Sequence, residues 1–85
     1  MKTERTYDYE NDDLAPSRAI ADIKEYMMSV YKDETQFNMM VAEVKKGISF
    51  ETMAFYFGMC GVEGYPVRSF YAKYSPNLDA KEIIV

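Results

Sequence analysis

Few side chains of this protein can carry out nucleophilic or metal chemistry. Its 85 residues include no histidine and a single cysteine, Cys60. A Ser-His-Asp or Cys-His arrangement, a Cys/His zinc site and an internal disulfide are therefore all excluded. Neither GxGxxG nor GxxxxGK[ST] occurs, so the sequence predicts no phosphate-cradling loop. No two carboxylates can be assigned as an acid and a base, and we expect a protein that is not an enzyme and uses no cofactor.

The one thiol, Cys60, lies between Met59 and Gly61 and has no basic neighbour in the sequence. A reactive thiolate needs positive charge close to it, so Cys60 is expected to act as a small apolar side chain. A single thiol, no signal peptide and no long apolar run together predict a reducing, cytoplasmic setting without a membrane partner.

Carboxylates gather at the start of the chain. Residues 1–14 hold two basic and five acidic side chains, a net charge of −3 out of −4 for the whole protein. Asp8, Glu10 and Asp12 have the alternating spacing of the first ligands in a calcium loop. The sixth position lacks glycine and the twelfth is Ala19 instead of glutamate, so no metal site is predicted.

The same fourteen residues contain almost no aliphatic side chain and show no hydrophobic period. They are expected to form a flexible acidic tail before a single domain of residues 15–85. In the other interpretation, Tyr7 and Tyr9 fold back onto that domain. Residues 65–85 carry three basic and two acidic side chains, a net charge of +1, so the overall acidity does not exclude nucleic acid as a partner.

Apolar side chains recur at spacings of three and four along most of the domain, which is typical of amphipathic helices. The fold class predicted is mainly α, a small helical bundle with helices at about 16–31, 34–46, 50–58 and 66–74. Gly47 and Gly58 are expected to end the second and third helices, and Ser49 to cap the third. As the alternative, aromatic and β-branched residues within 48–74 could form a hairpin in an α+β fold.

One segment has a recognisable pattern. Gly47, Ser49, the pair Met53-Ala54 and Gly58 have the spacing of a glycine, a capping serine, an apolar–alanine pair and a turn glycine. Residues 47–58 thus resemble the first half of a helix-turn-helix. A small Ala54 lets the next helix cross closely, and Gly58 would supply a positive φ in the turn.

The resemblance implies a transcriptional regulator that binds duplex DNA as a dimer through the helix at 66–74. The chain departs from the family pattern after Gly58, where Gly61, Gly64 and Pro66 demand a longer turn. Arginine can contact guanine, serine a phosphate or a base, and lysine a phosphate. The candidate DNA-binding residues are Arg68, Ser69, Lys73, Lys45 and Lys46.

A second function class rests on surplus apolar side chains. Residues 50–74 hold eight aromatic residues, and some large side chains lie off the apolar stripes of their helices. Aromatic and methionine side chains are enriched at protein interfaces, so these off-stripe residues favour a protein-binding surface. Carboxylates of the tail can also stand in for phosphates. The candidate protein-interaction residues are Phe55, Tyr56, Met28, Met39, Asp8, Glu10, Asp12 and Asp13.

In composition the chain is broadly similar to small acidic proteins of phages and mobile elements, including anti-CRISPR proteins. That similarity implies a regulator or inhibitor that binds a host nucleic-acid-handling protein, and we rank this function slightly ahead of the DNA-binding one. A domain this small with no disulfide or metal gains from further burial, so a homodimer is also expected. Ile83, Ile84 and Val85 could add a strand to a partner or pack on the domain.

Overall fold

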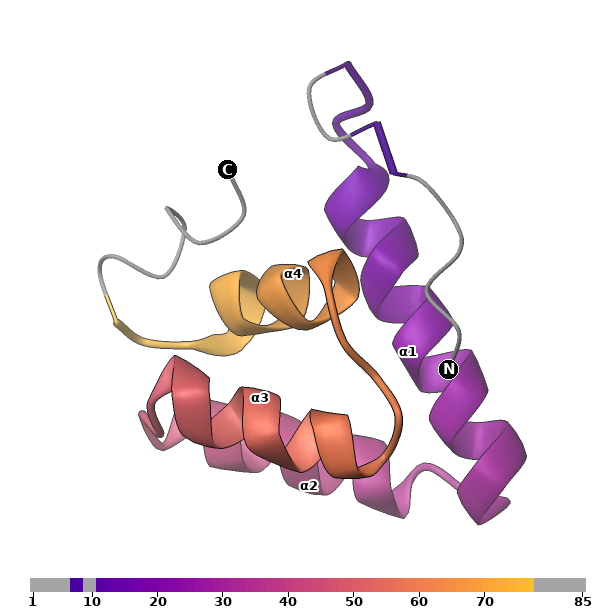
Figure 1. Ribbon diagram of the computed structural model, residues 1–85, viewed down its shortest axis with the longest axis vertical. Coiled ribbons are helices and arrows are strands. Elements are labelled where there is room, and N and C mark those ends of the chain that lie inside the picture. Colours follow the sequence, from indigo (N-terminus) through magenta and orange to yellow (C-terminus); the bar gives the residue numbers. More distant parts are fainter. Residues whose placement is uncertain (1–6, 9–10, 78–85) are drawn as a thin grey trace.

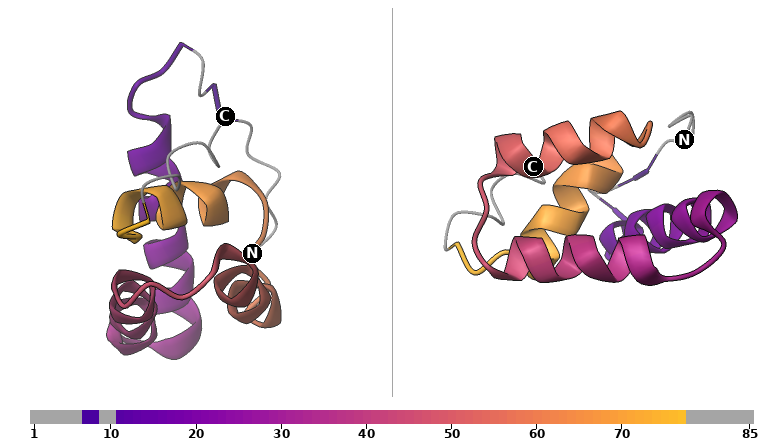
Figure 2. Two further views of the ribbon diagram at one scale, coloured as in Figure 1. Left: turned by 90° about the vertical axis from the view of Figure 1, so that its left-hand side faces the viewer. Right: turned by 90° about the horizontal axis from the view of Figure 1, so that it is seen from below.

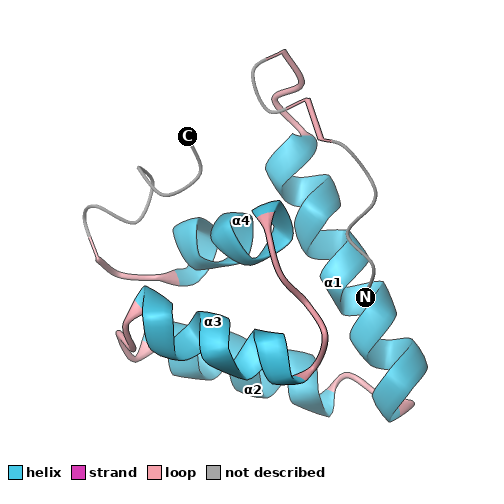
Figure 3. Cartoon of the chain, in the orientation of Figure 1, coloured by secondary structure: helices cyan, strands magenta, loops and turns pink. Residues whose placement is uncertain are grey.

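The computed structural model describes residues 7–8 and 11–77. Within those residues the chain forms four helices and no strand (Figures 1 and 3). The mainly α prediction is therefore confirmed, and the alternative hairpin within 48–74 is wrong. The expectations for Tyr9, Glu10 and residues 83–85 lie outside the described residues. The helices are α1 (Ala15–Tyr31), α2 (Thr35–Lys45), α3 (Phe50–Met59) and α4 (Tyr65–Tyr74).

The start of α3 and the end of α2 follow their predicted caps. Ser49 is extended, and its hydroxyl accepts a hydrogen bond from the backbone N–H of Thr52 at 3.2 Å. This bond satisfies one of the N–H groups that lack a partner in the first turn of a helix. After α2, Gly47 has a φ of +96° and its N–H donates to the carbonyl of Val44. Ser49 and Gly47 together fix the short connection that reverses the chain.

The end of α3 corrects one prediction. Gly58 stays helical, and the left-handed backbone occurs at Gly61, whose φ is +85°. The N–H of Gly61 donates to the carbonyl of Gly58, and the N–H of Val62 donates to that of Phe57 at 2.8 Å. These two bonds form a Schellman motif, in which an apolar residue after the glycine packs back on the helix. Val62 is fully buried in the same core cluster as Phe57.

Helix α4 is the centre of the bundle. It is the one helix that packs against each of the other three (Figures 1 and 2). The ring of Phe70 is fully buried and meets Phe37 of α2 and Phe57 of α3 edge-to-face, with centroid separations of 5.6 and 5.0 Å. Such pairs contribute about 0.5–1.5 kcal/mol each beyond the area that they bury. Phe70 therefore links three helices at one point.

Small side chains bring α1 close to α4. Ala15 and Ala19 are buried there with Tyr65. The N-terminal segment adds to this contact, because the Tyr7 ring lies 5.3 Å from that of Tyr65 and its hydroxyl donates to the carboxylate of Asp22. Tyr7 thus packs on the domain, as the fold-back interpretation predicts for this residue.

Helices α2 and α3 run antiparallel without packing closely against each other (Figure 2). They are held from one side by α4. Tyr71 of α4 also fastens the loop between them, because its hydroxyl donates to the carbonyl of Ile48 at 3.0 Å. The opposite side of the α2–α3 pair has no helix across it among the described residues.

Lys32 provides a test of this account of helix ends. It follows α1 in a left-handed conformation, with a φ of +69°, and it is the sole non-glycine residue with positive φ in the described chain. Glycine adopts this conformation without a Cβ clash, so Lys32→Gly should raise the free energy of unfolding by about 0.5–1 kcal/mol. Chemical denaturation measures this change.

The matched control is Lys46→Gly. Lys46 follows α2 with an ordinary helical φ of −74°, so glycine there adds freedom to the unfolded chain, and it also removes the weak, exposed ion pair with Glu43. We expect Lys46→Gly to lower stability by about 0.5–1 kcal/mol. If the two substitutions change the free energy of unfolding in the same direction, the positive φ at position 32 does not explain the effect of glycine there.

Candidate functional site

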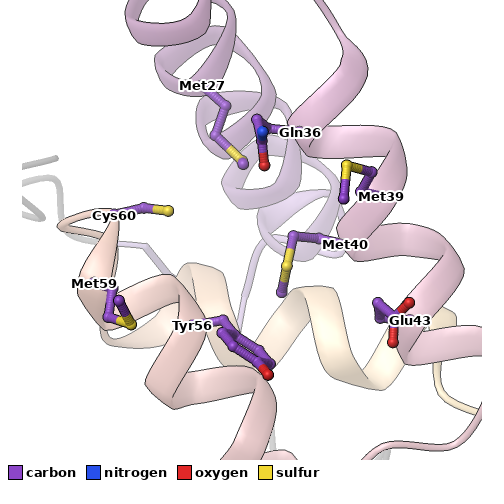
Figure 4. A pocket seen from close by; sticks show the side chains of 8 residues that line it. All are labelled: Met27, Gln36, Met39, Met40, Glu43, Tyr56, Met59 and Cys60. Atoms are coloured by element: carbon purple, nitrogen blue, oxygen red, sulfur yellow. The ribbon is translucent and has the colours of Figure 1, made fainter.

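The open side of the α2–α3 pair carries a pocket of about 270 Å³ (Figure 4). Both helices contribute to its walls, Met27 of α1 lines it as well, and Cys60 closes it at the end of α3. Five of its eight lining side chains contain sulfur, and the one charged residue is Glu43. The lining residues are Met27, Gln36, Met39, Met40, Glu43, Tyr56, Met59 and Cys60.

The outer face of α3 continues this apolar surface. Phe55 is 66% exposed and Met59 is 73% exposed, and both belong to the large apolar side chains that the fold leaves in solvent. The rings of Phe55 and Tyr56 lie 6.2 Å apart. Together with Thr52, these residues follow the i, i+3, i+4, i+7 spacing of one helix face. We call the pocket together with this face the α2–α3 groove.

The candidate protein-interaction residues fall into two groups. Met39 and Tyr56 come together in the groove, and Phe55 lies beside Tyr56. Met28 is exposed on α1 but does not line the pocket. The off-stripe positions therefore identified exposed apolar side chains correctly, and three of the four belong to one surface.

The candidate DNA contacts on α4 are placed differently from the helix-turn-helix expectation. Ser69 is 1% exposed, in the contact between α4 and the rest of the bundle, so it cannot reach a phosphate or a base. Arg68 lies over the ring of Tyr65, and Lys73 over that of Tyr74, at 5.8 and 5.3 Å. Seven of the ten residues of α4 are buried, so this helix presents no continuous face to a DNA groove.

The two lysines that end α2 lie on different sides. Lys45 approaches the Tyr74 ring, with its Nζ atom 5.9 Å from the centroid. Lys46 forms an ion pair of 3.2 Å with Glu43 at the edge of the groove. The structure therefore brings Lys45 and Lys73 together at the Tyr74 ring, but Lys46 and Arg68 lie at other partners, so the four basic candidates do not form one patch.

Two of the acidic candidates in the N-terminal segment, Asp8 and Asp12, bond to residues near them in the sequence. The carboxylate of Asp8 accepts hydrogen bonds from Asn11, that of Asp12 pairs with Arg18, and Asp13 is exposed. Glu10 lies outside the described residues. Asp12 accepts from the N–H of Leu14 as well, at 3.0 Å, so its carboxylate also shapes the turn before α1.

Cys60 connects the ends of α1 and α3. Its Sγ lies 3.2 Å from the hydroxyl of Tyr31, and its carbonyl accepts a hydrogen bond of 3.0 Å from Tyr26. The hydrogen bond to Cys60 and the charge of its thiolate raise the pKa of Tyr31, because both favour the protonated phenol. Cys60 thus has a structural role at the end of the groove.

Sequence reasoning missed Met59, Met40, Gln36, Glu43 and Cys60 as parts of a site. Met59 was missed because α3 was expected to stop at Gly58, which would place Met59 in a loop. In the structure α3 continues, and Met59 lies one turn after Tyr56 on the same wall. The available signal was the second glycine, Gly61, followed by the apolar Val62, which is the pattern of a Schellman motif.

No group of three or more Cys, Asp or Glu residues in the described ranges could hold a metal ion. None of the four helices is long and apolar enough to cross a membrane. Comparison with known proteins found no matching family model, no similar curated protein and no similar solved structure. The resemblances to helix-turn-helix and anti-CRISPR proteins therefore stay predictions.

Burial of Ser69 gives a test of where α4 lies. Its hydroxyl has no hydrogen-bond partner among the described residues, and a buried polar group without a partner destabilises a fold by about 1–3 kcal/mol. Ser69→Ala removes that group and should raise the free energy of unfolding by about 1 kcal/mol, as measured by urea denaturation. A surface serine that contacts DNA would show no such gain, so an unchanged or lower stability would contradict this placement.

Proposed function

We propose that this protein is a non-enzymatic regulator or inhibitor that acts by binding another protein through the α2–α3 groove. The observation that carries the proposal is the concentration of exposed Phe55, Tyr56, Met39 and Met59 around one apolar pocket. Exposed apolar side chains occur singly on most proteins, whereas a contiguous group of them marks an interaction site. Tyrosine and methionine supply contact area and adaptable packing.

The proposed target is a host nucleic-acid-handling protein. Proteins that bind nucleic acid carry basic surfaces, and carboxylates attract such surfaces over long range. The exposed Asp13 and the carboxylate of Asp8 supply negative charge near the start of α1. The support for a nucleic-acid-handling target is electrostatic, and it is independent of the support for the apolar groove.

The helix-turn-helix function is the weaker candidate. It needs α4 to enter a DNA groove, and the burial of Ser69 and of most of α4 opposes that role. If the protein nevertheless binds duplex DNA, its affinity should fall steeply with salt and depend on Arg68.

Site-specific photo-crosslinking tests the proposal. A benzophenone side chain introduced at Tyr56 should form a covalent adduct with a protein in the cells that produce this chain. The same group at Ala21, which is exposed on α1 and does not line the pocket, should form none, because that residue lies away from both the groove and the acidic segment. Adducts are read on a gel and identified by mass spectrometry.

A paired substitution supplies the control. Met59→Glu puts a charge into the groove and should weaken partner binding about tenfold or more, whereas Ala21→Glu should leave it unchanged. Both side chains are exposed, so both variants should unfold at the same denaturant concentration as the wild type. Equal adduct formation from positions 56 and 21, or equal binding by the two variants, contradicts the groove as the contact surface.

A further inference from the structure

The shape of the α2–α3 groove limits what can fill it. The lining residues of α2 run from Gln36 to Glu43, seven residues apart, which is about 10 Å or two helical turns. Opposite them, Tyr56 and Met59 form one turn of the other wall, and Met27 and Met40 also line the pocket (Figure 4). A trough of this length between two antiparallel helices accepts the apolar stripe of a third helix, with anchors at i, i+3 or i+4, and i+7.

The lining chemistry favours flexible apolar anchors. Four methionines line the pocket, and their unbranched thioether side chains repack around partners of different shape. Met39 and Met59 are exposed, so they can adjust without disturbing Phe37 or Phe57 in the core. Met27 belongs to that core cluster and Met40 packs against it, so these two form the fixed floor of the pocket. Leucine or phenylalanine side chains of a partner helix are the groups that such a lining accommodates.

The charges near the groove distinguish between two possible occupants, a second copy of this chain and a basic segment of another protein. Glu43 is the one charged residue of the lining, and residues 50–64 contain Glu51 and Glu63 but no lysine or arginine. Lys46 pairs with Glu43 at the edge of the groove, and other cations are held elsewhere, with Lys45 and Lys73 at the Tyr74 ring and Arg68 at that of Tyr65. A second copy of this chain would bring the same carboxylates against one another, whereas a basic partner would complement them.

We propose that the α2–α3 groove binds one cationic amphipathic helix of the partner protein, with apolar anchors in the pocket and lysine or arginine side chains beside Glu43. This inference rests on the proposed function and names the recognition element in the target. The ion pair between Glu43 and Lys46 is exposed on both sides, with an N–O distance of 3.2 Å. A basic residue of the helix can therefore replace Lys46 at little cost.

Three synthetic peptides of about 14 residues test this proposal. The first has leucines at helical spacing flanked by lysines, the second has glutamates in place of the lysines, and the third has the composition of the first in scrambled order. Fluorescence anisotropy should show the first binding at least about tenfold more tightly than the other two. Amide NMR shifts should concentrate at Met39, Met40, Tyr56 and Met59. Equal affinity for all three peptides, or shifts elsewhere, would overturn the proposal.

Charge reversal in the groove makes the test specific. Glu43→Lys should reduce the preference for the lysine peptide over the glutamate peptide by about tenfold, because it inverts the charge of the lining. Glu25→Lys makes the same charge change at an exposed position of α1 outside the pocket and should leave the preference unaltered. If Glu25→Lys has the same effect as Glu43→Lys, net charge alone determines binding and the groove has no role.

The outcomes also separate this inference from the proposed function. If no peptide binds while photo-crosslinks from Tyr56 still form, the cationic helix is wrong and protein binding stands. If neither is observed, both fail. If sedimentation shows a dimer that Met59→Glu dissociates and Ala21→Glu does not, a second copy fills the groove and the cationic helix is wrong.

Discussion

The contact of Phe70 with Phe37 and Phe57 is the interaction on which the rest of the structure depends. These three rings come from α4, α2 and α3, and all lie in the core. Helices α2 and α3 do not pack closely on each other, so α3 buries its apolar stripe mainly against α4, and α2 packs against both α4 and α1. The central position of α4 is therefore a requirement of the fold and leaves little of that helix for contact with another molecule.

The central position of α4 also determines where the proposed partner can bind. Because α4 occupies one side of the α2–α3 pair, the opposite side keeps exposed apolar side chains that no described residue covers. The lysines and the arginine that contact α4 lie over tyrosine rings, and none of them lines the pocket. Lys46 is paired with Glu43 at the edge of the groove. Most of the apolar surface is thus separated from those cations, which favours the proposed protein-binding function over DNA binding.

Much of the fold could be predicted from the hydrophobic periodicity and the helix caps, whereas the candidate site could be predicted only in part. The stripes and Ser49 located both ends of all four helices to within one residue, since capping acts between neighbours in sequence. Met39, Phe55 and Tyr56 were recognisable because they lie off those stripes. Met59 and Cys60 were not, because their positions depend on α3 continuing through Gly58. Burial of Ser69 was also unpredictable, since it depends on packing between helices distant in sequence.

The weak packing between α2 and α3 also bears on how the chain acquires its structure. Neighbouring helices that form a tight hairpin can fold as a local unit, whereas these two meet through a helix that follows both. The most extensive contact between helices joins α1 to α4, the first and last in the described chain. On a ribosome, this domain must therefore wait until residues 65–74 have left the exit tunnel before its core can close.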